Sequence, residues 1–268
     1  MTSLLDPQTL QAAAAEVARL AGAELVARFK LARTVEFKHE TDLVTDADTA
    51  AEQRIVDFLG QRFPGHGILA EERGACAGQG EYTWIVDPLD GTTNYAHRVP
   101  HFCVSVAVQD REGIAAAAVF DPVRGELFEA GRGRGAWLGE ERLRVSREAR
   151  VGRALLGTGF PYSVWDRPDR PLKLFDTFVR RAQGIRRAGS AALDMSYVAA
   201  GRYDGFFEFS LKPWDIAAGT LLVREAGGTV TDLVGAPLDF AVCDVMSSNG
   251  ALHEELVRLS REALGGSP

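Results

Sequence analysis

Apolar positions in the first 65 residues repeat with the spacing of two amphipathic helices. Those of the first stretch fall three or four residues apart and form one helical stripe: Leu10, Ala14, Val17, Ala21, Leu25 and Phe29. Asp6-Pro7 supplies an N-cap followed by proline at the first helical position, so the first helix is predicted to begin there. A second helix is predicted to start near Thr45 and to stop at Phe63-Pro64-Gly65.

Short strands and turns replace the helical period in residues 67–130. GILAEE (67–72) and TWIVD (83–87) are predicted to be strands that end in acidic residues. Pro88 is expected to stop the second strand, because proline cannot donate to a strand ladder. Three further apolar runs, FCVSVAVQ, IAAAAVF and ELFEA, are separated by the turn sequences DREG and DPVRG. This alternation predicts an antiparallel meander.

Strand and helix patterns alternate from about residue 150 onward. The predicted elements, in chain order, are the strand ALLGTGF, the helices RPLKLFDTFVRRA and SAALDMSYVAAG, the strand GFFEF, and the helices WDIAAGTLLVREAGG and HEELVRLSREAL. Such alternation is typical of a layered arrangement of helices on a sheet. We expect two halves, residues 1–148 with the meander and residues 149–268 with the second sheet, joined in one compact unit.

The composition supports a large core and restricts the class of protein. The chain has 268 residues, 46% of them hydrophobic, and a net charge of −7 that argues against a broad nucleic-acid-binding surface. Its three cysteines form no C-x-x-C, which disfavours a disulfide framework or a zinc site. No apolar run approaches the ~20 residues that span a bilayer, and no basic and apolar leader begins the chain. We therefore expect a cytoplasmic protein without a membrane association.

The segment WIVDPLDGTTN (84–94) places two aspartates directly after a strand. Converging carboxylates repel each other unless a cation lies between them, and the Asp87 and Asp90 oxygens, with the Leu89 carbonyl, are ligands that Mg²⁺ prefers. The alternative is that Asp87 only ends a strand and Asp90 only caps a helix. The following Gly-Thr-Thr favours the metal, because Gly91 lets backbone approach a ligand and helix N-terminal amides favour phosphate. A cation site beside an anion site suits metal-assisted phosphoryl chemistry.

Further acids lie at the end of a predicted strand or the start of a predicted helix: Asp48, Glu71, Glu72 and Asp215. Each has an ordinary alternative, because acids favour helix starts through the helix dipole and paired glutamates often lie in exposed turns. Their shared position makes them candidates to complete a metal shell. The four arginines in residues 180–187 form either a local basic patch or a solvated helix end.

Five segments together resemble the inositol monophosphatase family. WIVDPLDGTTNYAHRVPHF resembles its first signature, and KPWDIAAGTLLVREAGG resembles its second. ILAEE is similar to its Glu-Glu metal segment, KHETDLVTDAD to its N-terminal lithium-sensitive phosphatase motif, and RRAGSAALDMSYVAAGRYDGFFEF to bacterial members. The resemblance spans roughly residues 10–260. It implies an α+β fold, the layered α-β-α-β-α sandwich that inositol monophosphatases share with fructose-1,6-bisphosphatases.

The resemblance also implies the residues of a metal-dependent active site. Two to three Mg²⁺ ions are implied, held by four carboxylates and one carbonyl: Glu71, Asp87, Leu89, Asp90 and Asp215. The implied catalytic residues are Asp48, Thr92 and Glu71, with Asp48 and Thr92 activating the attacking water. Substrate contacts are implied at Gly91, Thr92, Thr93, Gly189, Ser190, Ala191, Glu208 and Asp215.

Some of these positions carry a more specific implication. The amides of Gly91 and Thr92 would hold the phosphate, and Glu208 would contact inositol hydroxyls. Lys38 matches a basic residue near the N-terminal motif. CDVMSSNGAL (243–252) matches the substrate-proximal Asn region of the family only loosely.

The activity implied by the resemblance is hydrolysis of inositol 1-phosphate, or a similar small polyol phosphate, by a metal-activated water. The same chemistry on histidinol phosphate, fructose 1,6-bisphosphate or a nucleotide 3′-phosphate stays open, although Asn94 favours the inositol type. An association with nucleic acid or the transcription machinery also stays open, because close bacterial members resemble a protein that joins that machinery. A homodimer and inhibition by lithium are further implications, whereas the retained acids argue against an inactive scaffold.

Overall fold

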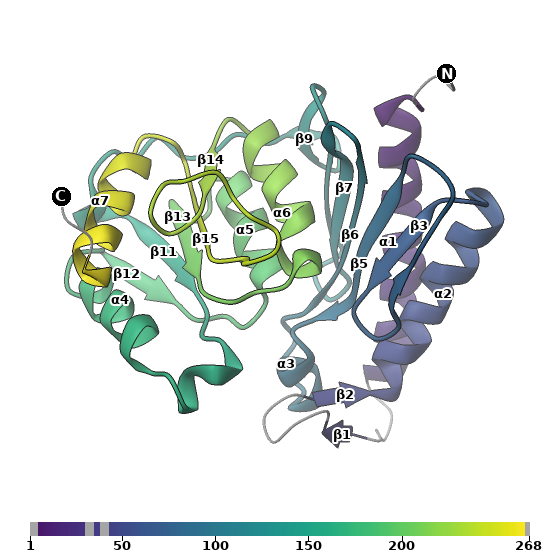
Figure 1. The fold of residues 1–268 in the computed structure, drawn as a ribbon, viewed down its shortest axis with the longest axis horizontal. Coiled ribbons are helices and arrows are strands. Elements are labelled where there is room, and N and C mark those ends of the chain that lie inside the picture. Colours follow the sequence, from purple (N-terminus) through teal and green to yellow (C-terminus); the bar gives the residue numbers. More distant parts are fainter. Residues whose placement is uncertain (1–4, 30–34, 38–42, 266–268) are drawn as a thin grey trace.

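The computed structural model describes residues 5–29, 35–37 and 43–265 and arranges them in five layers (Figure 1). Helices α1 (Pro7–Phe29) and α2 (Asp46–Arg62) cover one face of an eight-stranded sheet. Helices α5 (Ala191–Ala199) and α6 (Pro213–Glu225) lie between this sheet and a five-stranded sheet. Helices α4 (Asp169–Val179) and α7 (His253–Leu264) cover the outer face of the second sheet. The expected α-β-α-β-α sandwich is confirmed.

The eight-stranded sheet has the order β10-β9-β8-β7-β6-β5-β3-β4. Its strands from β5 to β10 pair antiparallel with their sequence neighbours, which confirms the predicted meander, and β3 pairs parallel to β5. The strands are β3 (Gly67–Ala70), β4 (Gly74–Cys76), β5 (Thr83–Asp90), β6 (Cys103–Asp110), β7 (Gly113–Asp121), β8 (Glu126–Gly131), β9 (Gly135–Leu138) and β10 (Glu141–Arg142).

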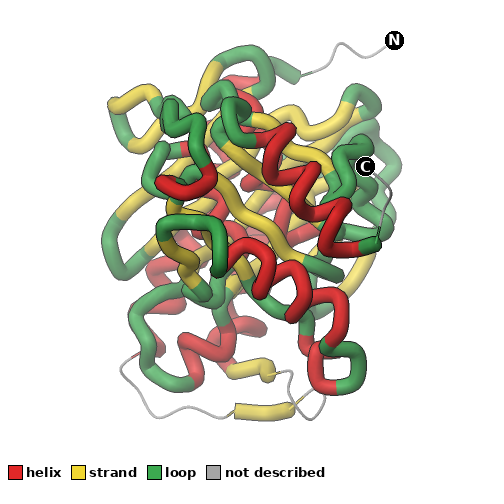
Figure 2. Tube along the Cα trace, turned by 90° about the vertical axis from the view of Figure 1, so that its left-hand side faces the viewer, coloured by secondary structure: helices red, strands yellow, loops and turns green. Residues whose placement is uncertain are grey.

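The five-stranded sheet has the order β12-β11-β13-β15-β14, parallel among the first three strands and antiparallel among the last three. Figure 2 views its outer face, where α7 and α4 lie side by side in front of the strands. The strands are β11 (Leu155–Thr158), β12 (Gly184–Arg186), β13 (Gly205–Glu208), β14 (Thr229–Thr231) and β15 (Val245–Ser248). The short elements are β1 (Val35–Phe37), β2 (Leu43–Thr45), α3 (Thr92–Ala96) and the 3-10 turns Val151–Arg153 and Tyr162–Trp165.

Strand β5 continues past Asp87, so the predicted stop at Pro88 is wrong. Asp87 lies opposite Ser105 on β6, whereas Asp90 lies opposite Cys103. Three steps on β5 therefore match two steps on β6, which is a β-bulge with one extra residue. Proline is tolerated there because the ladder is interrupted at the bulge. A regular strand would put residues three apart on opposite faces, and the extra residue brings both aspartates to the same face.

The two sheets share a central apolar core around α5 and α6. Ile85 and Ala117 of the first sheet belong to the same buried cluster as Ile216 and Leu222 of α6. The two helices pack closely, because a Cβ atom on Gly219 of α6 would lie 2.6 Å from the Cβ of Met195 on α5. Among the described helices, none combines the length and apolar character that a membrane span requires. The division of the chain at residue 148 stays a prediction.

Candidate active site

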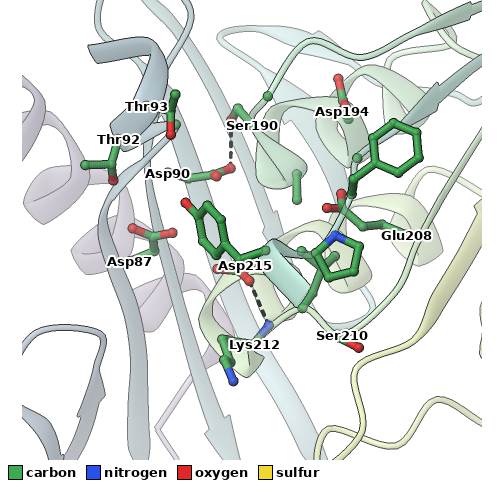
Figure 3. A pocket seen from close by; sticks show the side chains of 18 of the residues that line it. Asp87, Asp90, Thr92, Thr93, Ser190, Asp194, Glu208, Ser210, Lys212 and Asp215 are labelled. Carbon is green, nitrogen blue, oxygen red and sulfur yellow. Dashed lines mark hydrogen bonds between the residues drawn. The ribbon is translucent and has the colours of Figure 1, made fainter. Parts of the chain in front are cut away.

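A pocket of about 380 Å³ lies where the bulged end of β5 meets the N-terminal ends of α5 and α6 (Figure 3). Its walls carry many more carboxyl groups than cations. The acidic lining residues are Glu71, Asp87, Asp90, Asp194, Glu208 and Asp215, and the basic ones are Arg187 and Lys212. The structure therefore brings together on one pocket the four carboxylates that the sequence predicts as metal ligands, although they are up to 144 positions apart in the chain.

The carboxylate of Asp87 is the most enclosed of the acids that β5 carries. Its Oδ1 accepts a hydrogen bond of 2.9 Å from the Leu89 amide, and the residue is 2% exposed. Burial raises the pKa of Asp87 well above its usual value, and the charges of Glu71, Asp90 and Asp215 raise this pKa further. The charges of the other three predicted ligands thus all repel the ionised form of Asp87 within one pocket.

Asp90 links the first sheet to the N-terminus of α5. Its Oδ2 accepts hydrogen bonds of 2.7 Å from the Ser190 hydroxyl and of 2.7 Å from the Ala192 amide. Burial raises the pKa of Asp90, and the Ser190 and Ala192 hydrogen bonds oppose that rise. Ser190 was predicted to be a substrate contact, and in the structure its hydroxyl is engaged with Asp90 at the pocket wall.

Asp215 occupies the first turn of α6 and caps it. Its Oδ2 accepts a hydrogen bond of 2.7 Å from the Lys212 amide, as Figure 3 shows. Burial raises the pKa of Asp215 well above its usual value, followed by the charge of Asp90. Asp215 therefore caps a helix and also lines the acidic pocket, and its role as a metal ligand stays a prediction.

The donor set of the pocket fits a hard divalent cation. It consists of carboxylate oxygens and the Leu89 carbonyl, the ligand type that Mg²⁺ takes, and mutual repulsion of the acids favours a cation. In this conformation, no three His, Cys, Asp or Glu side chains within residues 5–29, 35–37 and 43–265 are grouped to hold a metal ion. One oxygen each of Asp87, Asp90 and Asp215 accepts a hydrogen bond from a backbone amide. The predicted sharing of ions stays a prediction.

Thr92 begins the short helix α3 and faces the buried Asp48. Its hydroxyl lies 3.3 Å from Asp48 Oδ1 and donates to the Leu89 carbonyl at 3.0 Å. The other Asp48 oxygen accepts from the Thr45 amide and hydroxyl at 2.8 and 2.6 Å, which closes the capping box that starts α2. Burial raises the pKa of Asp48 to about 6, so this carboxylate can take up a proton near neutral pH.

The helix start at α3 also presents backbone to the pocket. Gly91 has a φ of +100°, which favours glycine, and a Cβ there would lie 3.0 Å from the His101 carbonyl oxygen. The first amides of a helix have no partner within the helix, so they suit an anion such as phosphate. Thr93 lines the same wall and is exposed. Gly91, Thr92 and Thr93 thus line the pocket, and their contact with phosphate stays a prediction.

The opposite wall is formed by the second half of the chain. Gly189, Ser190 and Ala191 line it at the start of α5, and Glu208 lies at the end of β13. Glu208 is 8% exposed, and burial raises its pKa to about 8, with Arg187 opposing the rise and Asp90 adding to it. A carboxyl group of this kind suits recognition of hydroxyl groups.

Three charged residues of the pocket, Arg187, Asp194 and Lys212, are not among the site residues that the sequence predicts. Arg187 lines the pocket, whereas the arginine run was read as a basic patch or a helix end. Asp194 is 1% exposed, and its Oδ1 has no hydrogen-bond partner. Asn94 donates to the carbonyls of Ala188 and His101 at 2.9 and 2.8 Å and so fixes the wall near Gly189. A search for charged residues just before a capped helix would have found Arg187.

Other predicted positions fall outside the pocket. Arg180 pairs with Asp176 one turn back on α4, and this part of the arginine run is a helix end. The Glu72 amide donates to Glu52, and Glu72 is absent from the pocket lining. Asn249 of the loosely matching segment donates to Ser146 and to the Glu148 carbonyl, which is a structural role. Lys38 lies outside the described residues.

Comparison with known proteins gives one family over nearly the whole chain. The family model described as "Inositol monophosphatase family" matches residues 6–264. The "Nus factor SuhB" of Pseudomonas aeruginosa is 52% identical over 208 residues, covering 76% of this chain and 77% of that protein. The "Inositol-1-monophosphatase" of Caulobacter vibrioides is 41% identical over 233 residues, covering 85% and 91%.

A solved structure gives the same result for the fold. The crystal structure of the extragenic suppressor protein suhB from Bartonella henselae superposes with a TM-score of 0.91 at 38% identity, covering 95% of this chain and 99% of that one. Sequence and structure thus agree over nearly the whole length. The chain belongs to the inositol monophosphatase family.

Proposed function

We propose that the protein is a Mg²⁺-dependent phosphomonoesterase that hydrolyses inositol 1-phosphate or a closely similar polyol phosphate. The observation that carries the proposal is the placement of Glu71, Asp87, Asp90 and Asp215 on one pocket beside the helix start at Gly91. A cation between the acids and the anion-binding turn would offset the repulsion of both the carboxylates and the phosphate. The family membership supports the phosphatase class, and the pocket chemistry supports the metal.

Different residues of the site are proposed to hold the metal, orient the phosphoryl group and orient the attacking water. Glu71, Asp87, Asp90, Asp215 and the Leu89 carbonyl are proposed to hold Mg²⁺, which neutralises phosphate charge when it is bound. The amides at the start of α3 orient the phosphoryl group, and the Thr92 hydroxyl orients the attacking water. The single Thr92 hydroxyl hydrogen faces both the Leu89 carbonyl and Asp48. With the Leu89 carbonyl engaged by Mg²⁺, this hydrogen would go to Asp48, which would leave a Thr92 lone pair to accept a hydrogen bond from that water.

The polyol half of the substrate is assigned to the pocket wall that the second half of the chain forms and that contains Glu208. The polar groups there include the Glu208 carboxyl group, the Arg187 guanidinium group and the backbone of Gly189–Ala191. These groups are proposed to bind the hydroxyls of the alcohol. Because backbone and metal hold the phosphate in the same way for every ester, selectivity has to come from this wall. A buried carboxyl group can exchange hydrogen bonds with the hydroxyls of a polyhydroxylated alcohol.

Phosphate release from a panel of esters tests the substrate. Inositol 1-phosphate, histidinol phosphate, fructose 1,6-bisphosphate and a nucleotide 3′-phosphate are compared at equal concentration, with Mg²⁺ and with a chelator. We expect turnover to require Mg²⁺ and kcat/KM to be highest for inositol 1-phosphate. Activity that survives chelation contradicts the metal dependence, and a higher kcat/KM for another ester reassigns the substrate.

An association with the transcription machinery is the second candidate. It is favoured by the relatives named Nus factor SuhB, among them the Escherichia coli protein, which is 41% identical over 254 residues. A pull-down of RNA polymerase and its associated factors with the wild type and with Asp90→Asn separates the two roles. Binding that persists in the variant while phosphatase activity is lost supports an independent role. The homodimer is a further proposal, which light scattering after size-exclusion chromatography tests.

A further inference from the structure

Gly159, in the loop after β11, lies directly against the carboxylate of Glu208. A Cβ atom on this buried glycine would lie 2.2 Å from both Glu208 carboxylate oxygens, closer than any real Cβ contact. Backbone strain does not require glycine here, because the φ of Gly159 is outside the left-handed region. The absence of a side chain at this position therefore serves the neighbouring carboxylate, because it leaves the space that Glu208 fills.

Glu208 has little freedom to move to an equivalent place. It is 8% exposed, and the charges of Asp90, Asp194 and Asp215 all interact with it. Asp194 is the most enclosed of these, and its Oδ1 already lacks a hydrogen-bond partner. The Arg187 charge attracts Glu208. A carboxyl group displaced from its present place would crowd the other acids or leave the pocket, and both outcomes cost free energy in a buried site.

We propose that Gly159 is a positioning residue that sets the place of the Glu208 carboxylate and thereby the preference for hydroxylated leaving groups. The proposal rests on the proposed function, since it concerns the alcohol half of the same substrate. Glu208 contacts a hydroxyl of the polyol, and a methyl group at residue 159 would push the carboxylate away from that hydroxyl. An ester whose alcohol has no further hydroxyl does not use this contact.

The test compares two esters in the full-length protein with Mg²⁺. Inositol 1-phosphate carries the hydroxyls, and phenyl phosphate lacks them. We expect Gly159→Ala to lower the ratio of their kcat/KM values by about 10- to 100-fold, mainly through KM for inositol 1-phosphate, the range expected for a lost hydrogen bond to a charged or buried group. The control is Gly152→Ala, whose new Cβ meets only the Arg181 carbonyl at 3.7 Å and should leave the ratio unchanged.

A double-mutant cycle ties the effect to Glu208. In the Glu208→Ala background, Gly159→Ala should change the ratio by less than about twofold, because the group it displaces is already absent. Glu208→Asp should partly restore the ratio in the Gly159→Ala protein, because the side chain is one methylene shorter. This rescue also separates displacement of the carboxylate from a general loss of folding.

An unchanged ratio in Gly159→Ala, or an equal fall in the Glu208→Ala background, overturns the positioning role while the phosphatase assignment stands. If the wild type releases phosphate from neither ester, the proposed function fails and the inference falls with it.

Discussion

Replacing Glu208 by glutamine tests how strongly the pocket disfavours ionised acids. Glutamine keeps the size and one oxygen of the side chain but has no proton to lose. Burial raises the pKa of Glu208 to about 8 from the ordinary 4.5. At neutral pH the folded protein therefore retains a proton on Glu208 that the unfolded chain has released. The variant removes this difference between the folded and unfolded states.

The sign and size of the effect follow from proton linkage. A raised pKa in the folded state gives stability that is complete below pH 4.5 and is lost as the pH rises toward about 8. Between these two pH values, the free energy of unfolding of the wild type falls by up to about 1.4 kcal/mol for each unit that the pH rises, because the folded state retains one more proton than the unfolded chain. Between pH 5.5 and 7.5, Glu208→Gln should gain stability relative to the wild type by up to about 3 kcal/mol.

Urea denaturation at the two pH values, in the presence of a chelator, measures the difference. The matched control is Glu255→Gln on α7, where a hydrogen bond from Arg258 at 2.8 Å lowers the pKa of the carboxyl. A lowered pKa affects stability only below about pH 4.5, so this variant should show a constant difference from the wild type across the range. A constant difference for Glu208→Gln as well would show that Glu208 is ionised in the folded protein and would contradict its raised pKa.

Changes at the acids and at Thr92 should affect catalysis in graded ways. Asp90→Asn should lower kcat/KM by at least about 10³-fold, because the amide keeps an oxygen for Ser190 but loses the charge. Circular dichroism should show that the fold is retained. Activity within tenfold of the wild type would argue against the role of Asp90. Thr92→Ala should lose more activity than Thr92→Ser in the phosphate-release assay, because serine keeps the hydroxyl near Asp48; equal losses contradict the hydroxyl role. Lithium chloride should inhibit where equal sodium chloride does not, because Li⁺ can replace a weakly held Mg²⁺, and identical curves for the two salts would count against this.

The fold was largely predictable because its elements obey local patterns. The stripe that includes Leu10, Val17 and Leu25 is buried along α1, and the turn sequences mark the ends of the meander strands. The stop at Pro88 failed because a local rule about proline met a tertiary feature, the bulge opposite Ser105 and Cys103. Whether a strand contains a bulge depends on the register of its neighbour, which the sequence of β5 does not contain.

The candidate site was predictable where motifs carry it and unpredictable where packing does. Asp87, Asp90 and Asp215 stand in recognisable segments, and the structure places them on one pocket. Gly159 lies in none of these segments, and only its contact with Glu208 distinguishes it. Asp194 lies in the segment RRAGSAALDMSYVAAGRYDGFFEF, but only the unpaired Oδ1 in the structure distinguishes it from its neighbours. Ser190 shows an intermediate case, because its position was found but its partner, Asp90, comes from the other sheet 100 residues away.

The fixed dipoles of the fold do not balance the acids of the pocket. The Ala192 amide at the start of α5 and the Lys212 amide before α6 donate to Asp90 and Asp215, and a helix terminus offsets about 1 kcal/mol for each carboxylate. Two carboxylates about 5 Å apart at an effective dielectric constant of about 20 repel by roughly 3 kcal/mol. The folded site must therefore take up protons or cations, and the two compete for the same oxygens. Bound Mg²⁺ is accordingly expected to flatten the pH dependence of stability that the chelated protein shows, and it would do so most at the higher pH, where protons leave the site.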